Sequence, residues 1–443
     1  MKKLLIVDDD DDVRNLHSLR LNDVYETIMT GNPEEALALA GRGLTLLAAL
    51  PASARRDAAE LELQLILAPN LRVTKGWAAP DLAAVLDRAL ALCDRVGTAA
   101  QRAQILYGMQ SYYMVAGRLE KAALVNDEIV RLLRETQGSE PPPPAFGFPG
   151  ILLLMGRYQE ACDEFERLDR DADPGWLRRL QGSQGLNYRV INRAWQSHAL
   201  WCLGRPDTAV ARASEALEHA RQLGQPFSQT IAATYQALLQ QLLRDAATFG
   251  RQAKEALALA TETKAVYYRA WAAILVAYAD TLDHPEAPAL TRLRSAIDDF
   301  KATGARSRLP YYLALLADAH LRGGHAEPGL ALVEEALAVG RETSERWWDA
   351  DLHRLRATLL LAGGAETAEA EAALGRALEI ARGQGARSLE LRAALELGRL
   401  WGSAGRSEEA RNLVAPILSA FTEGLETSDL RAARALLSGD LQS

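Results

Sequence analysis

The sequence predicts an all-α fold, an α-solenoid built from antiparallel helix pairs. An apolar helix, a glycine-centred turn and a second apolar helix recur about every 40 residues along most of the chain. The turns read AGR (116–118), MGR (155–157), LGRP (203–206), RGGH (322–325), AGGA (362–365) and AGR (404–406). Because one helix pair cannot bury its apolar face alone, neighbouring pairs must stack into a continuous array. Such an array offers a curved binding surface rather than a catalytic pocket.

The first 32 residues do not share this repeat. A short apolar run, Leu4–Val7, ends in a series of aspartates and predicts a buried strand. Apolar residues at near-helical spacing predict a helix over 13–23, and the alternation over 24–31 predicts a second strand. We therefore expect residues 1–32 to form a small β-α-β fragment in front of the helical array.

Two helices are predicted to follow this fragment. The first runs from Pro33 to about Leu50, because proline suits the first turn of a helix and the two glutamates after it suit the positive N-terminal end. The second covers residues 54–67 and is predicted to break at Pro69, which cannot donate a helical hydrogen bond.

A proline-rich segment divides the helical part. SEPPPPAFGFPG at 139–150 predicts a stiff connector in polyproline II conformation, with a ligand for a proline-binding domain as the alternative. We therefore predict N-terminal helical repeats over 33–138 and a C-terminal repeat array over 151–443. A last helix near Ser428–Leu437 is expected to cap the array.

One repeat shows how the pattern specifies packing. Over 205–223 the apolar residues form a single stripe, and the charged residues occupy the opposite face. Gly204 supplies a backbone conformation that other residues resist, so it ends the first helix. Ala209, and Ala410 after the turn at Gly405, are small enough to let two helices approach closely. Both alanines are predicted to be buried at helix crossings.

Composition and charge exclude several classes of protein. The 443 residues are 49% hydrophobic and 24% charged, with a formal net charge of −8. That charge argues against non-specific nucleic-acid binding, which needs a basic surface to displace phosphate counterions. Cys93, Cys162 and Cys202 are far apart and are predicted to be buried, reduced thiols in a cytoplasmic protein. No signal peptide and no run of about 20 apolar residues is present, so no membrane contact is expected.

The repeats resemble tetratricopeptide repeats. The small residue after the turn, which is Ala122, Ala161, Ala209 or Ala410 in four of the copies, matches the position at which that family packs its two helices. The resemblance implies a superhelical array that binds a protein or a peptide on its concave face.

Several segments resemble a narrower group of proteins. Residues 46–97, 347–364, 370–401 and 421–437 are similar to the C-terminal helical region of large bacterial signalling proteins. In those proteins an adenylate/guanylate cyclase domain and a predicted NTPase precede the repeats. Because the phosphate-binding pattern G-x-x-x-x-G-K-[ST] does not occur in this sequence, the catalytic activities are not carried over. We expect a protein that is not an enzyme and needs no cofactor.

Residues 1–40 resemble the opening of a response-regulator receiver domain. Asp8 and Asp9 match the acidic pair that holds Mg²⁺ in that family. The phosphoacceptor at the end of the third strand is missing, because the only candidate strand, GLTLLAALP at 43–51, places Ala48 there. The resemblance implies a truncated receiver with a vestigial Mg²⁺ site. The alternative for the acidic run is a solvated loop at a helix start.

Adjacent aromatic residues suggest where a partner binds. They stand near the start of three first helices, at 267–268, 311–312 and 347–348. Neighbouring side chains on a helix point about 100° apart, so one ring of each pair can pack inside while the other reaches the groove. In the alternative, both rings pack between repeats. Nearby arginines could grip a carboxylate or phosphate group. The candidate partner-binding residues are Tyr268, Arg269, Tyr312, Trp348 and Arg354.

The leading hypothesis is a non-enzymatic bacterial signalling scaffold that binds a protein or peptide along the concave face. The first alternative is a phosphorelay protein with a degenerate receiver, and the second is a small-ligand sensor. A long open groove would favour the scaffold, whereas a polar cavity with convergent arginine and tryptophan would favour the sensor. The unpaired edge of the first strand offers a further surface, for self-association.

Overall fold

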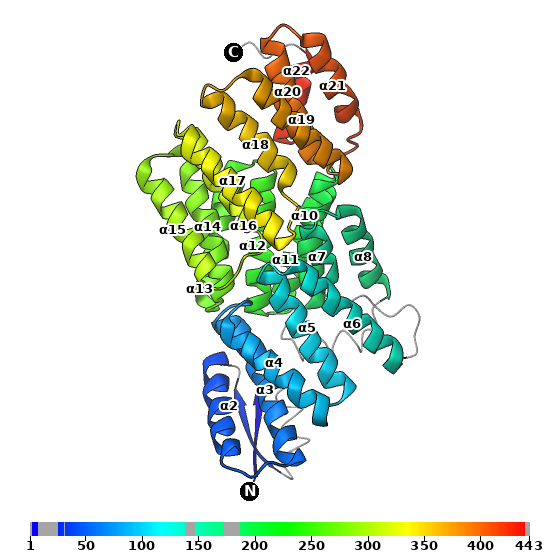
Figure 1. Cartoon of the computed structure of the whole chain (residues 1–443), viewed down its shortest axis with the longest axis vertical. Coiled ribbons are helices and arrows are strands. Elements are labelled where there is room, and N and C mark those ends of the chain that lie inside the picture. The colour runs from blue at the N-terminus through cyan, green and yellow to red at the C-terminus, as the bar shows by residue number, and fades with distance from the viewer. Residues whose placement is uncertain (1, 8–24, 31, 138–146, 172–186, 439–443) are drawn as a thin grey trace.

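The computed structural model describes residues 2–7, 25–30, 32–137, 147–171 and 187–438 (Figure 1). Three helices form the N-terminal part: α2 (Pro33–Ala48), α3 (Ala54–Thr74) and α4 (Pro80–Val96). The first helices of the following pairs are α5 (Ala99–Val115), α7 (Phe148–Leu154), α10 (Tyr188–Cys202), α12 (Pro226–Leu242), α14 (Val266–Asp283), α16 (Leu309–Arg322), α18 (Asp349–Ala362) and α20 (Arg387–Ser403). Their second helices are α6 (Leu119–Gln137), α8 (Tyr158–Asp171), α11 (Pro206–Gln222), α13 (Ala246–Glu262), α15 (Ala287–Ala302), α17 (Ala326–Thr343), α19 (Thr367–Gly383) and α21 (Ser407–Ser419). The chain ends in α22 (Ser428–Ser438).

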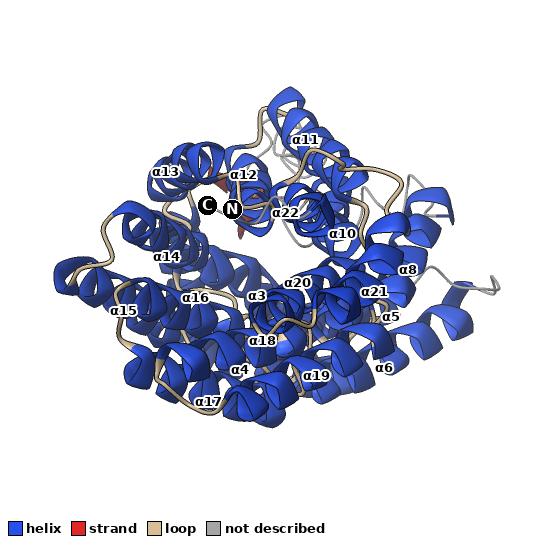
Figure 2. Cartoon of the chain, turned by 90° about the horizontal axis from the view of Figure 1, so that it is seen from above, coloured by secondary structure: helices blue, strands red, loops and turns tan. Residues whose placement is uncertain are grey.

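The helix pairs wind into a superhelix. Seen from above, α16, α18 and α20 lie toward the inside, while α15, α17 and α19 form the outer layer (Figure 2). Each first helix packs on its own second helix, and from α10 to α18 each also packs on the first helix of the next pair. The α-solenoid predicted from the repeating pattern is confirmed. None of the described helices is both long and apolar enough to cross a membrane.

The glycine turns lie where the sequence placed them. Each of the six predicted turns contains a glycine with positive φ, a conformation that L side chains resist. At Gly204 the φ angle is +81°, and a Cβ atom there would lie 2.9 Å from the Cβ of Arg387 in a distant repeat. A further turn, between α12 and α13, is closed by Arg244 rather than by a glycine, with a φ of 58°. Gly204 is therefore required both for the turn and for the close approach.

The alanines after the turns are buried, as predicted. Ala122, Ala161 and Ala209 are fully buried, and Ala410 is 3% exposed. Each lies in the first turns of a second helix, where that helix meets its neighbours.

Enlarging one of these alanines should destabilise the array. Ala209→Leu adds three carbon atoms to a fully buried crossing, so we expect the free energy of unfolding to fall by about 1–3 kcal/mol. Ala211→Leu, an exposed position on the same helix, is the matched control and should change it by less than about 0.5 kcal/mol. Urea titration of both variants measures the difference. Equal losses of stability in the two variants would mean that Ala209 does not lie at a helix crossing.

The break predicted at Pro69 is wrong. Helix α3 continues through this proline to Thr74. The side chains of Leu65, Leu67 and Leu71 are buried on both sides of it. The side-chain amide of Asn70 also donates to the carbonyl of Ile66 at 2.8 Å. Packing and this local hydrogen bond outweigh the one helical bond that proline removes.

The N-terminal segment is described only in part. Strands β1 (Lys2–Val7) and β2 (Tyr25–Thr30) pair in parallel, with Lys2 opposite Tyr25. The helix expected over 13–23, and Asp8 and Asp9 with it, lie outside the described residues. Residues 43–48, weighed above as a third strand, belong to helix α2. Beyond the strand pair, the described residues do not support a receiver-like fragment.

Successive turns of the superhelix stack directly on one another. The backbone N–H groups of Arg306 and Arg346 donate to the carbonyls of Val115 and Leu154 at 2.9 and 2.8 Å. The Ser388 hydroxyl donates to the Trp201 carbonyl at 2.5 Å across 187 residues of sequence. The Val115 and Leu154 carbonyls end α5 and α7, where no partner is available within the helix, and the Trp201 carbonyl near the end of α10 also accepts from the Gly204 N–H at 3.0 Å. Late repeats thus cap the helix ends of early repeats, and part of the concave face becomes core.

A buried arginine marks the centre of this stacked region. Arg308 is 1% exposed, and its guanidinium carbon lies 4.7 Å from the ring centroids of Trp195 and Trp347. Its backbone N–H donates to both carboxylate oxygens of Glu345, at 3.1 and 2.9 Å, and the Trp347 indole N–H donates to Glu345 at 2.6 Å. The contacts join residues of the turns before α16 and α18 to helix α10.

This junction predicts a pH-dependent contribution to stability. Burial raises the pKa of Glu345 from its ordinary 4.5 to about 7, despite the opposing effect of the Arg308 amide and guanidinium. The folded protein therefore keeps a proton that the unfolded chain loses at lower pH. We expect the stability of the wild type relative to Glu345→Gln to fall by about 2–3 kcal/mol as the pH rises from about 4.5 to about 7.

The stability of the wild type is compared with that of Glu345→Gln because other buried groups change stability with pH in the opposite direction. Burial holds the pKa of His198 well below 6.5, so His198 costs stability as the pH falls. Its contribution is shared by both proteins and cancels in the comparison. Denaturant titrations of wild type and Glu345→Gln at several pH values measure the effect. A difference that does not change with pH would mean that Glu345 is ionised in the folded state.

Candidate ligand-binding cavity on the inner face

Residues of α12, α13, α14, α16, α18 and α20 line a cavity of about 320 Å³. It adjoins a wider groove of about 940 Å³, because Gln240, Arg244, Asp245 and Ala246 line both. The loop between α21 and α22 forms the opposite wall of the groove. Together they leave an elongated space inside the superhelix beside the stacked region.

An aromatic wall forms one side of the cavity. Phe249 on α13, Tyr278 on α14 and Trp348, which directly precedes α18, contribute to it. Trp348 is 3% exposed and is held by Trp201 at a centroid distance of 6.2 Å and by Tyr311 at 5.0 Å, the latter edge-on. Packing therefore fixes the Trp348 ring, and the part of it that lines the cavity can contact an apolar group of a ligand.

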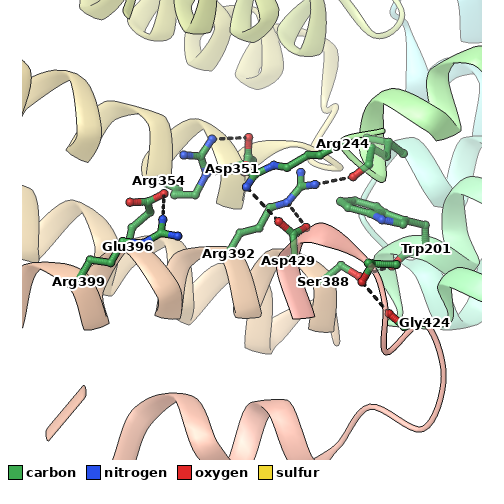
Figure 3. Close-up of polar contacts among 12 residues, drawn as sticks. Trp201, Arg244, Asp351, Arg354, Ser388, Arg392, Glu396, Arg399, Gly424 and Asp429 are labelled. Carbon is green, nitrogen blue, oxygen red and sulfur yellow. Dashed lines mark hydrogen bonds and ion pairs between the residues drawn. The ribbon is translucent and has the colours of Figure 1, made fainter. Parts of the chain in front are cut away.

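A buried network of arginines and aspartates forms another side (Figure 3). Arg354 donates to both oxygens of Asp351, at 2.7 and 3.1 Å. Arg392 donates to Asp429 at 2.8 Å, and Arg244 makes a 3.0 Å ion pair with the other oxygen of Asp429. The Arg392 guanidinium also stacks on the Trp201 ring, 4.7 Å from its centroid.

The members of this network stay charged. Burial alone would raise the pKa of Asp351, but Arg354, with Arg392 and Arg244 behind it, lowers that pKa to about 2. Burial would also raise the pKa of Asp429, but Arg392 and Arg244 hold it below its ordinary value. The charges of these arginines are therefore already paired with Asp351 and Asp429.

The mouth of the cavity carries less compensated charge. Asp318 accepts hydrogen bonds from Tyr278 and Arg322 at 2.7 and 2.8 Å. Asp245 caps helix α13 through the Thr248 amide at 3.1 Å. Asp283, the last residue of α14, is exposed. Within the described part of the chain, neither Asp245 nor Asp283 makes an ion pair.

Gln240 is the polar group that the protein leaves open to this space. It is 9% exposed and lines both the cavity and the groove. Its amide forms no hydrogen bond with any residue the structure describes, whereas the neighbouring Gln241 accepts one from Tyr311 at 2.7 Å. The Gln240 amide faces this space without a protein partner among the described residues, so it is available to donate to and accept from a ligand.

The candidate partner-binding residues do not all meet. Trp348 and Arg354 line the cavity. Tyr268 lines a separate, smaller pocket of about 40 Å³, and Arg269 is exposed elsewhere on α14. Tyr312 is fully buried against Phe300 and Tyr311. Both rings of each aromatic pair are buried because superhelical turns stack on the inner face. In this conformation Tyr312 is a core residue that a partner cannot reach.

Sequence reasoning did not find the other charged lining residues. The detectable signals were ion-pair spacings inside otherwise apolar first helices: Asp318 with Arg322, four residues apart, and Asp351 with Arg354, three apart. Arg244 and Arg392 come from different repeats, and neither they nor their shared partner Asp429 belong to a common local pattern.

The described residues do not form a metal-binding site. Asp8 and Asp9 lie outside the described residues. His320 and His325 have ring centroids 6.0 Å apart. No group of three or more histidine, cysteine, aspartate or glutamate side chains is arranged to hold a metal ion in the ranges that the structure describes.

Comparison with known proteins leaves the family open. No protein-family model matches the chain. The uncharacterised protein R02095 of Rhizobium meliloti (strain 1021) is 37% identical over 102 residues. The match covers 23% of this chain and 10% of that protein, so the chain spans only about a tenth of its relative's length.

Solved helical-repeat structures are similar at low identity. A Rap protein complexed with competence and sporulation factor is 12% identical with a TM-score of 0.46, over 77% of this chain and 97% of that one. A signal-transduction ATPase with a tetratricopeptide repeat sensor from Pyrococcus horikoshii is 11% identical with a TM-score of 0.42, over 94% and 66%. Yeast Tom70 is 14% identical with a TM-score of 0.36, over 92% and 96%. Likeness at this level carries no argument about what the present chain binds. The chain's own geometry shows an α-solenoid with a polar, aromatic-walled cavity among its described inner helices.

Proposed function

We propose that the protein is a non-catalytic bacterial signalling scaffold that binds a peptide segment, free or within a partner protein, in the inner-face cavity. The observation that carries the proposal is the open amide of Gln240 at the junction of cavity and groove. A peptide group pairs with such an amide through one donor and one acceptor. The buried free thiols Cys93, Cys162 and Cys202 support a cytoplasmic setting.

The shape of the space supports a peptide as well. A groove that leads into a partly open cavity admits a chain end or a short extended segment. The aromatic wall at Trp348 accommodates an apolar side chain, while the groove along the loop between α21 and α22 takes the continuing backbone. Binding anchored by one buried aromatic contact and several amide hydrogen bonds is a common mode of peptide recognition.

A small-ligand sensor is the second candidate. The convergence of Arg244, Arg354 and Arg392 beside Trp348 favours it. An anionic effector would have to compete with Asp351 and Asp429, which already hold these guanidinium groups at 2.7–3.0 Å. That competition favours the peptide. The phosphorelay alternative and a Mg²⁺ site at Asp8 and Asp9 rest on residues outside the described ranges.

Blocking the junction tests the proposal. Ala246 is exposed and lines both spaces, so Ala246→Trp should obstruct them without entering the core. The probe is a library of random seven-residue peptides, with binders from wild type measured by fluorescence anisotropy. We expect Ala246→Trp to weaken their binding at least about tenfold. The neighbouring Ala247→Trp, also exposed but outside the lining, is the matched control. Binding unaffected by Ala246→Trp, or no binders at all, would refute the site.

A further inference from the structure

We propose that the peptide bound in this cavity is cationic, with a lysine or arginine side chain placed against Asp245 and Asp283 at the mouth. This inference rests on the proposed function and specifies its ligand. It is drawn from the charge of the lining, from the position of the two acids and from the open polar group beside them.

The lining as a whole is negatively charged. The cavity and the groove together contain five arginines and seven carboxylates, which leaves an excess of two negative charges. The deepest arginines, Arg354 and Arg392, are neutralised by Asp351 and by Asp429, which is also buried. The rest of the lining holds three arginines, at 244, 322 and 431, against six carboxylates, so the surface that a ligand meets on entry is acidic on balance.

Asp283 lies where its own helix disfavours it. The C-terminal end of a helix carries partial negative charge, so a carboxylate on the last residue of α14 is destabilising by itself. No cation among the described residues pairs with it, and the same holds for Asp245. A lysine or arginine from outside would relieve both. An anionic ligand would instead add to the repulsion at the mouth.

The unpartnered Gln240 amide provides an independent indication of a ligand at the same place. It is nine-tenths buried and lies in the same turn region as Asp245, on the lining common to cavity and groove. A peptide whose backbone pairs with Gln240 and whose apolar side chain contacts Trp348 would carry its basic side chain at the mouth. Peptide backbone, apolar anchor and cation together define the ligand class.

The test uses the full-length protein and the same random seven-residue library, now sequenced after selection. We expect lysine and arginine to be enriched over aspartate and glutamate among binders of the wild type. Asp245→Asn with Asp283→Asn should weaken binding of a selected lysine-containing peptide by about fivefold or more. Asparagine caps a helix as well as aspartate, and removing Asp283 relieves the helix end, so the melting temperature should not fall.

Asp280→Asn is the matched control, because Asp280 is exposed in the last turn of the same helix but does not line the cavity. It should leave peptide affinity unchanged. Enrichment of acidic or uncharged peptides that Ala246→Trp still abolishes would overturn the cationic assignment while the peptide site stands. Equal losses from Asp280→Asn and the double variant would also overturn it. A library that yields no binder refutes the proposed function itself.

Discussion

We expect Arg392→Met to lower the free energy of unfolding by about 3–5 kcal/mol, because it leaves a buried carboxylate without its main partner. The Arg392 side chain is 4% exposed and donates to Asp429 at 2.8 Å. Its second nitrogen donates to the carbonyl of Leu242, at the end of helix α12. The substitution keeps the volume but removes both bonds, while Arg244 alone cannot replace them from its exposed position.

Arg399→Met on the same helix is the matched control. Arg399 pairs with Glu396 at 3.2 Å, but its side chain is 42% exposed. Exposed pairs of this kind contribute about 1 kcal/mol or less. Urea titration of both variants gives the comparison. The double variant Arg392→Met, Asp429→Asn should be more stable than Arg392→Met alone, because the uncompensated charge is gone. If Arg392→Met proves as mild as the control, the network does not hold α20 and α22 to α12.

Trp347→Ala should cause a loss of similar size, about 3–5 kcal/mol, through a cavity in the core. Trp347 is fully buried between superhelical turns. Its backbone N–H donates to the Leu154 carbonyl at 3.1 Å, and its own carbonyl accepts from the Tyr158 hydroxyl at 2.6 Å. Loss of the ring also removes the indole donor to Glu345 and one of the faces that hold Arg308.

The loss of protection in Trp347→Ala should be local, which distinguishes it from the effect of an arbitrary core mutation. Amide hydrogen exchange should accelerate at Arg306 and Arg346, whose N–H groups cap the early helices. Trp401→Ala is the control, since Trp401 is only half-buried on α20 and bonds to the half-exposed Glu371 at 2.8 Å. It should cost less and leave those amides protected. Unchanged exchange at Arg306 and Arg346 in Trp347→Ala would show that the turns are held together elsewhere.

Local features of the fold could be predicted from sequence because they depend on neighbouring residues. A glycine such as Gly204 ends a helix wherever it occurs with a new helix start after it, and an alanine such as Ala209 marks a crossing. Pro69 was misjudged because the packing around it, rather than its own chemistry, decides the length of α3. Arg308 was missed for a related reason: its φ of 64° is maintained by contacts with distant rings.

The cavity could be predicted only in part. Trp348 and Arg354 stood out because an aromatic pair and a nearby arginine are visible within eight residues of sequence. Tyr312 looked equivalent, yet stacking of the superhelix turns buries it completely. The hydrogen bond between Arg392 and Leu242 joins residues 150 positions apart, so the sequence of neither repeat predicts it. What a helical repeat presents to a ligand depends on how many turns the superhelix makes, which no single repeat specifies.

The capped carbonyls of Val115, Leu154 and Trp201 also determine how the molecule responds to tension. In an open solenoid each repeat contacts only its neighbours, so a pulling force peels repeats off one at a time from an end. Here successive superhelical turns are joined by hydrogen bonds and packing. These contacts share the force, so they must break before any single repeat can unfold. When the chain is stretched by its two ends, we expect one large unfolding event rather than a series of small ones. Reclosure would be slow, because distant segments must find each other again.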